Sequence, residues 1–181
     1  MNALSLWIVV LLAVGVDPTG DAVRELLQKT WKSPAAQAKR TGNAVVGRAS
    51  RQKADMAAVQ YAYGILLTHA DDWDAAEAVF KRIVKASPQH ADAQLALCAC
   101  HLRTGKYEPA LQTLEKAVQA DPKSPAVAGF AGALLTRWME APPEKMKAEK
   151  IEAARAKLFA ALDPEAQKEF QRAAEIGRAH V

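Results

Sequence analysis

The feature that most constrains this chain is an internal repeat with a period of 34 residues. Residues 57–90 align with residues 91–124 without a gap, and seven positions of the alignment are identical. Ala76 is matched by Ala110 and Pro88 by Pro122, while Trp73 is matched by Tyr107. A period of this length is typical of solenoids and other repeat architectures, in which every unit is one supersecondary element.

Each unit predicts a pair of helices. Asp72 is a candidate N-cap for a helix over residues 73–86, in which apolar residues recur at spacings of three and four. Ser87-Pro88 ends this helix, because the residue before a proline disfavours the α conformation. Frequent alanine and an aromatic content of only 6% favour packed helices over a sheet. The predicted helices cover residues 55–69, 73–86, 91–103 and the stretch between Gly105 and Asp121.

A third, degenerate unit begins at Ser124-Pro125, an N-cap followed by proline at the first helical position. Its second helix comes late and carries Ala154, Leu158 and Ala161 at the spacing of the earlier units. The added residues before that helix predict either a longer loop or a first helix that continues to near Ala141. Residues 163–175 then predict a C-terminal capping helix.

These residues resemble the tetratricopeptide repeat, a family with a 34-residue pattern. The family's small residue in the first helix is Gly64 and then Cys98, whereas its opening tryptophan is replaced by Gln60 and Gln94. The resemblance implies an all-α fold, a right-handed superhelical stack of helix-turn-helix repeats, or α-solenoid. It covers residues 55–162 as repeats at 55–88, 89–122 and 123–162, the last with an insertion. The family's series of Ala, a bulky apolar residue, a further apolar residue and Pro appears as Ala76, Phe80, Ile83 and Pro88, then as Ala110, Leu114, Ala117 and Pro122.

The same resemblance implies that the first helix of each pair lines a concave groove that binds a partner. Chaperone-binding members hold a peptide carboxylate with lysine and asparagine at two groove positions, and the corresponding residues here are apolar, glycine or tyrosine. We therefore expect a largely apolar groove without that clamp. The candidate groove residues are Tyr61, Ile65, Thr68 and His69 in the first repeat, Asp92, Leu95, Ala99, Leu102 and Arg103 in the second, and Gly129, Ala133, Thr136 and Arg137 in the third.

Two occupants of that groove are open. One is another protein, supplying a peptide or an amphipathic helix. The other is the amphipathic segment at Ala22, Val23, Leu26 and Leu27 of this chain, folded back on the repeats. The intervening residues 28–55 are weakly patterned and would make closure of this loop loose, which favours another protein.

The first 54 residues differ from the repeats in composition. Residues 3–16 are almost continuously apolar and predict a signal peptide or membrane anchor over residues 1–16, with a buried N-terminal helix as the alternative. We therefore expect an exported or membrane-anchored protein, with a cytoplasmic one as the alternative. Residues 17–54 predict a linker with a short helix, which holds seven basic residues and no acidic one between residues 26 and 54. The last residues, 176–181, resemble the translation of a sequencing adapter, and we expect a non-native tail there.

Side chains with catalytic or metal-binding chemistry are few. Cys98 and Cys100 lie two residues apart on a predicted helix and so point about 200° apart, which prevents a shared metal ion or a disulfide. The sequence contains no phosphate-binding loop, nucleophile motif or metalloprotease motif. We therefore expect no enzyme activity, no cofactor, no metal and no small-molecule substrate.

The function that these observations favour is a non-catalytic protein-interaction scaffold. The alternative is a basic arm that binds anionic lipid or nucleic acid, with the repeats as its scaffold. Nucleic acid is disfavoured, because no aromatic residue is interleaved with the basic ones after Trp31. A further alternative is a fragment of a larger multidomain protein.

Overall fold

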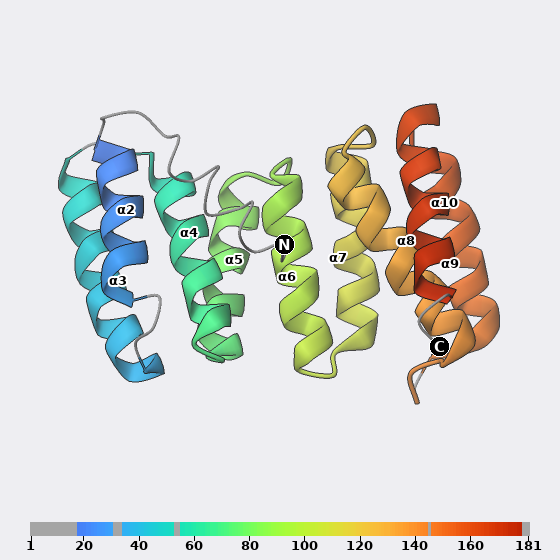
Figure 1. Cartoon of the computed structure of the whole chain (residues 1–181), viewed down its shortest axis with the longest axis horizontal. Coiled ribbons are helices and arrows are strands. Elements are labelled where there is room, and N and C mark those ends of the chain that lie inside the picture. The colour runs from blue at the N-terminus through green and yellow to red at the C-terminus, as the bar shows by residue number, and fades with distance from the viewer. Residues whose placement is uncertain (1–17, 31–33, 53–54, 145, 179–181) are drawn as a thin grey trace. The chain divides into compact units, whose positions relative to one another are not determined.

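The computed structural model describes residues 18–30, 34–52, 55–144 and 146–178. Within these residues the fold is all α, a helical-repeat solenoid of nine helices without a strand (Figure 1). None of the described helices is long and apolar enough to cross a membrane. The helices are α2 (Pro18–Thr30), α3 (Ala35–Arg51), α4 (Met56–His69), α5 (Trp73–Ala86), α6 (Ala91–Arg103), α7 (Tyr107–Ala120), α8 (Pro125–Glu140), α9 (Ala148–Ala161) and α10 (Pro164–Arg178).

Side-chain caps set the starts of several helices, as the sequence predicts. The Asp72 carboxylate accepts a hydrogen bond from an amide in the first turn of α5 at 3.2 Å, and Asp163 does the same for α10 at 2.8 Å. Asp55 caps α4 in this way at 2.9 Å. These bonds satisfy amides that have no partner inside the helix. The predicted helix over residues 73–86 is confirmed in full as Trp73–Ala86.

The tight turns inside two of the helix pairs share one backbone conformation. Asp71 has a φ of 60° in the α4–α5 turn, and Gly105 has a φ of 70° in the α6–α7 turn. The two residues are one 34-residue period apart in the sequence. Glycine adopts this left-handed conformation without strain, and aspartate is among the few other residues that tolerate it. Asp71 is also held by its carboxylate, which accepts a hydrogen bond from the Trp73 indole.

The described residues divide into two compact units, residues 1–83 and 84–181, with the division inside α5. In the first unit, α2 and α3 pack against each other and against α4. This differs from the linker with a short helix that the sequence predicts for residues 17–54. Val23, Leu26, Val45 and Ala49 are buried, with at most 2% of each residue exposed.

The sequence pattern did not predict the helix pair α2–α3, because small residues form part of its buried surface. One period before Ala76 and Ile83 stand Gly42 and Ala49, and both of these small residues are buried. The ring of Tyr63 on α4 fills the space beside Gly42. The segment at residues 22–27, one of the two open candidates for filling the groove, therefore packs as part of a degenerate helix pair one period upstream.

In the second unit, α8 packs against α9 and α10. The amide of Asp163, just before α10, donates to the carbonyl of Pro122, just before α8, at 3.1 Å. The two helices therefore begin side by side and run in the same direction (Figure 1). A Cβ atom at Gly132 would stand 2.2 Å from the Phe170 carbonyl oxygen, so α10 approaches α8 closely at this glycine.

In this unit two sequence expectations are revised, and the expected helix to near Ala141 is confirmed. Ala161 is exposed, and the buried stripe of α9 is Ile151, Ala154 and Leu158. The insertion proves to be both a first helix that continues to Glu140 and a longer connection before α9. The capping helix α10 continues to Arg178 and so includes the first three residues of the predicted tail. The predicted signal peptide or anchor at residues 1–16 and the end of that tail lie outside the described residues.

Candidate partner-binding face

The candidate face in the second unit is built from α6 and α8, the first helices of two successive pairs. These helices contact each other, so side chains predicted on separate repeats come together. Ser124 begins α8 by accepting a hydrogen bond from the amide of Val127 at 3.3 Å. The predicted residues that are partly exposed here are Leu95, Ala99 and Leu102 on α6, together with Gly129 and Ala133 on α8.

The middle of this face is apolar, and α8 is open at one of its positions. Leu95 and Leu102 lie two turns apart on one side of α6, and each packs partly against the hydrophobic core of the unit. Ala99 lies between them. A Cβ atom at Gly129 would meet no heavy atom within 4 Å, so the surface of α8 is open at this position. The arrangement suits an apolar side chain from outside.

Charged side chains lie at the helix ends of this face. Asp92 is partly exposed in the first turn of α6, while Arg103 is exposed in its last turn. Arg137 is exposed in the last turn of α8, one period after Arg103. Both arginines complement the negative ends of their helix dipoles. A partner that lies along the face would therefore meet positive charge near one end.

Thr136 does not belong to the exposed part of this face. Only 6% of the residue is exposed, and its hydroxyl has no hydrogen-bond partner among the described residues. In an earlier repeat, the position that corresponds to Thr136 lies on the outer side of the first helix. It is buried in the third repeat because α8 is packed against both α9 and α10. The candidate residues of the third repeat thus reduce to Gly129, Ala133 and Arg137.

In the first unit, the candidate residues lie on α4. Tyr61, Ile65 and Thr68 are partly exposed, and His69 is exposed. The Tyr61 ring lies edge-on to Phe80 of α5 with centroids 5.8 Å apart, and the Thr68 hydroxyl donates to the Ile65 carbonyl at 2.7 Å. Partial burial lowers the pKa of His69, which favours the neutral imidazole at pH 7. Tyr61 and Thr68 thus make contacts within the first unit, while His69 stays exposed.

The polar groups beneath the α6 surface are arranged for packing. The Thr113 hydroxyl lies 3.3 Å from His101 Nδ1, and both residues are buried. Burial raises the pKa of the Cys98 thiol to about 12, with the neighbouring Cys100 thiol as a second cause. A thiol in this environment stays protonated and unreactive at neutral pH. In the part of the chain that the structure describes, no three His, Cys, Asp or Glu side chains gather as metal ligands.

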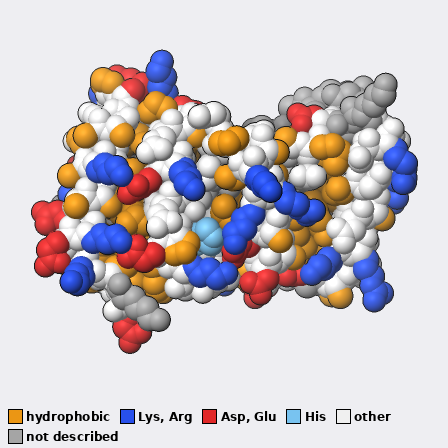
Figure 2. Space-filling model, turned by 180° about the vertical axis from the view of Figure 1, so that it is seen from behind, with side chains coloured by type: hydrophobic (Ala, Val, Ile, Leu, Met, Phe, Trp, Pro, Cys, Tyr) orange, Lys and Arg blue, Asp and Glu red, His pale blue; other side chains and the backbone are white. Residues whose placement is uncertain are grey.

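The basic residues between 26 and 54 that the structure describes lie on α2 and α3, and several have acidic partners. Glu25 accepts from Lys29 at 2.7 Å and from Arg48 at 2.5 Å, and Lys39 pairs with Asp72 at 3.3 Å. Figure 2 shows one face of the molecule, on which Lys and Arg side chains are interspersed with Asp and Glu. The basic character of this segment is therefore partly neutralised within the first unit.

Two polar side chains that line pockets in the second unit were not among the site residues predicted from the sequence. Gln94 is 2% exposed, its Oε1 atom has no hydrogen-bond partner among the described residues, and it borders a pocket of about 460 Å³ with Lys85 and Lys116. Arg155 lines a pocket between α9 and α10. For Gln94 the signal was present, because an amide stands on an otherwise apolar side of α6. For Arg155 the sequence holds no such signal, because it does not show which acidic side chains pack near this arginine.

Comparison with known proteins identifies the repeats. Two family models described as tetratricopeptide repeat match the chain, one over residues 67–134 and the other over residues 39–90. The second match includes most of α3, in agreement with a degenerate helix pair upstream of residue 55. Searches of curated proteins and of solved structures gave no match. Together the two models span residues 39–134, more than half of the chain, and the chain belongs to the tetratricopeptide repeat family.

Proposed function

We propose that this protein is a non-catalytic interaction scaffold and that the α6–α8 face of its second unit binds an apolar peptide or amphipathic helix of another protein. The observation that carries the proposal is the pair of partly exposed leucines, Leu95 and Leu102, on α6, a helix that contacts α8. Repeat proteins of this family present their first helices to partners, which supports the choice of face.

The chemistry of the face favours apolar anchoring over carboxylate capture. Leu95 and Ala99 stand where chaperone-binding members would carry lysine and asparagine, and Gly129 and Ala133 stand there in the next repeat. An anchor residue gains most when it fills a pocket from which water is excluded. A helix with leucine or phenylalanine on successive turns fits the spacing of Leu95 and Leu102.

The basic-arm alternative has weaker support. Residues 35–51 form α3, which packs in the first unit, and Lys39 and Arg48 have acidic partners there. Binding carried by these residues would fall steeply with salt, whereas apolar binding would not. Salt dependence therefore separates the two functions.

Export or membrane attachment is a separate part of the proposal. It rests on the apolar run at residues 3–16 alone. N-terminal sequencing of the protein recovered from cells expressing the full chain is its test, since a cleaved signal peptide would leave a mature N-terminus near residue 16.

The test of the binding face uses a synthetic peptide selected from a random display library on the full chain. Leu95→Asp with Leu102→Asp should weaken its binding about tenfold or more, as for loss of a ~1.4 kcal/mol contact. Because both leucines also contact the core, Ala99→Arg provides a second variant that blocks the face without removing buried atoms. Ala153→Arg, at an exposed alanine of α9, is the matched control and should bind as the parent does.

Two results would overturn this assignment. In one, Ala99→Arg binds the peptide as tightly as Ala153→Arg does. In the other, binding survives every α6 substitution, falls with salt and is lost in Arg40→Glu with Arg51→Glu. That second result would assign recognition to α3.

A further inference from the structure

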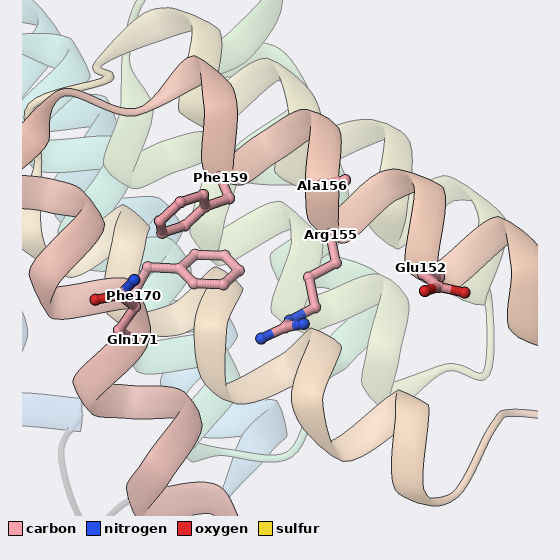
Figure 3. A pocket seen from close by; sticks show the side chains of 6 residues that line it. All are labelled: Glu152, Arg155, Ala156, Phe159, Phe170 and Gln171. Carbon is pink, nitrogen blue, oxygen red and sulfur yellow. The ribbon is translucent and has the colours of Figure 1, made fainter.

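A pocket of about 310 Å³ lies between α9 and α10 (Figure 3). Four of its lining residues come from one side of α9, at spacings of three and four, and two come from α10. Its volume is near the lower end of the range of about 300–1,000 Å³ for small-molecule pockets. The lining residues are Glu152, Arg155, Ala156, Phe159, Phe170 and Gln171.

Arg155 is the one basic side chain among the residues that line this pocket, and it forms no ion pair with the part of the chain that the structure describes. Its Nε atom is buried and has no hydrogen-bond partner among the described residues, and no ion pair joins it to any of them. The lysines of the same helix differ, because Lys150 pairs with Glu108 at 2.5 Å and Lys157 with Glu115 at 2.9 Å. A guanidinium without an ion-pair partner beside a pocket is unfavourable, so an anion that pairs with it would be held strongly.

Two phenylalanine rings form the apolar side of the pocket, next to this guanidinium. The rings of Phe159 and Phe170 meet edge to face with centroids 5.4 Å apart. Phe170 is 1% exposed, and its backbone is held against Gly132 of α8, whereas Phe159 is partly exposed and can contact a ligand. In Figure 3 the Arg155 guanidinium extends toward the Phe170 ring, and the Glu152 carboxylate lies apart from it.

We propose that this pocket binds a single carboxylate carried on a small apolar or aromatic group. The planar guanidinium of Arg155 would take the carboxylate through two parallel hydrogen bonds, and the Phe159 ring would cover the apolar part. Glu152 at the rim would repel a second negative charge, which disfavours dicarboxylates and phosphate. The carboxylate comes either from a free acid or from the C-terminal residue of a peptide. This site goes beyond the proposed scaffold function, which does not use α9 or α10.

The first experiment titrates phenylacetate into the full chain and follows amide and arginine Nε–H resonances by NMR. Saturable shifts at Arg155, Phe159 and Gln171 are expected, with no comparable shifts from phenylacetamide or inorganic phosphate. Arg155→Gln should weaken phenylacetate binding at least tenfold, and Arg155→Lys should also weaken it, because an ammonium keeps the charge and loses the paired donors. Arg172→Gln, on the exposed side of α10, is the matched control and should bind as the parent does.

A second arm separates the two sources of the carboxylate. A short peptide ending in phenylalanine with a free carboxylate is compared with the same peptide amidated. Tighter binding by the free-acid peptide than by phenylacetate assigns the pocket to peptide C-termini, whereas binding of phenylacetate alone assigns it to a free acid. The proposal is overturned if neither probe gives a saturable shift at millimolar concentration, if phenylacetamide binds as well as phenylacetate, or if Arg155→Gln binds like the parent.

Discussion

The two compact units bring their helices together at glycines, but the glycines face different kinds of neighbour. In the first unit, a Cβ at Gly42 would stand 2.1 Å from the Tyr63 ring, and one at Gly64 would stand 2.6 Å from the Phe80 ring. In the second unit, a Cβ at Gly132 would meet the backbone of Phe170. A ring can turn or shift within its cavity, whereas the backbone of a packed helix moves only as a whole. The same residue type therefore tolerates substitution differently in the two units.

The largest effect is expected at Gly132. Gly132→Ala should destabilise the chain by about 1–3 kcal/mol, because the added methyl group forces α10 away from α8. Urea unfolding monitored by circular dichroism measures this change. Gly129→Ala on the same helix is the control, since it meets open space and should gain up to about 1 kcal/mol of helix propensity. Equal stabilities for the two variants would show that α8 and α10 are not in close contact.

A smaller loss is expected at Gly64. Gly64→Ala should destabilise by about 1 kcal/mol, the low end for overpacking, because the Phe80 ring can turn away from the new methyl group. The double variant Gly64→Ala with Phe80→Leu has a smaller side chain at residue 80, which leaves room for the new methyl group. Its loss of stability should therefore be smaller than the sum of the losses in the two single variants. Gly47→Ala, where a Cβ meets nothing within 4 Å, is the control. If Gly64→Ala cost more than Gly132→Ala, the contrast between ring and backbone neighbours would be wrong.

The turns allow the two units to be compared at equivalent positions. Gly105→Ala should lower stability by about 1 kcal/mol, because alanine is strained at a φ of 70°. Asp71→Gly relieves the same strain but removes the carboxylate that accepts from Trp73, so the net change should stay within about 0.5 kcal/mol of zero. Thermal unfolding of both variants measures the difference. A loss at Asp71→Gly as large as that at Gly105→Ala would mean that the hydrogen bond dominates the turn.

The smallest effect is expected from the ion pairs at Glu25, which join α2 to α3. Hydrogen bonds from Lys29 and Arg48 lower the pKa of the Glu25 carboxyl from its ordinary value of 4.5. A folded-state pKa below the unfolded value gives stability that is present above about pH 4.5 and is lost as the pH falls through the folded pKa. Because these groups are largely exposed, Glu25→Gln should remove no more than about 1 kcal/mol at pH 7, and less in high salt. Parent and variant should converge in stability at low pH, and a constant difference across the pH range would contradict this account.

Sequence patterning predicts the regular part of this fold well, because caps and periodic apolar residues act locally. Asp72 and Asp163 begin helices where expected, and Gly105 ends the first helix of its pair. The sequence pattern did not predict the helix pair α2–α3. Its buried positions include Gly42, which has no side chain, and Ala49, which has only a methyl group, and such residues add little to a hydrophobic pattern. Only an extension of the 34-residue period upstream would have placed these two residues at the positions of Ala76 and Ile83.

The candidate site shows the limit of local patterning more clearly. Thr136 is buried because a helix from far along the chain packs against α8, which position in a repeat does not reveal. On α9, Lys150 and Lys157 pair with glutamates of α7, whereas Arg155 has no ion-pair partner among the described residues. Such differences are set by contacts between helices, and a single sequence does not state them.

The claim that α6 and α8 form the binding face is tested most directly by methyl NMR of the full chain with the selected peptide. The account predicts shifts concentrated at the methyl groups of Leu95, Leu102, Ala99 and Ala133, with Leu158 of α9 and Val45 of α3 unchanged. Shifts confined to α3, or to α9 and α10, with Leu95 and Leu102 unmoved, would contradict it.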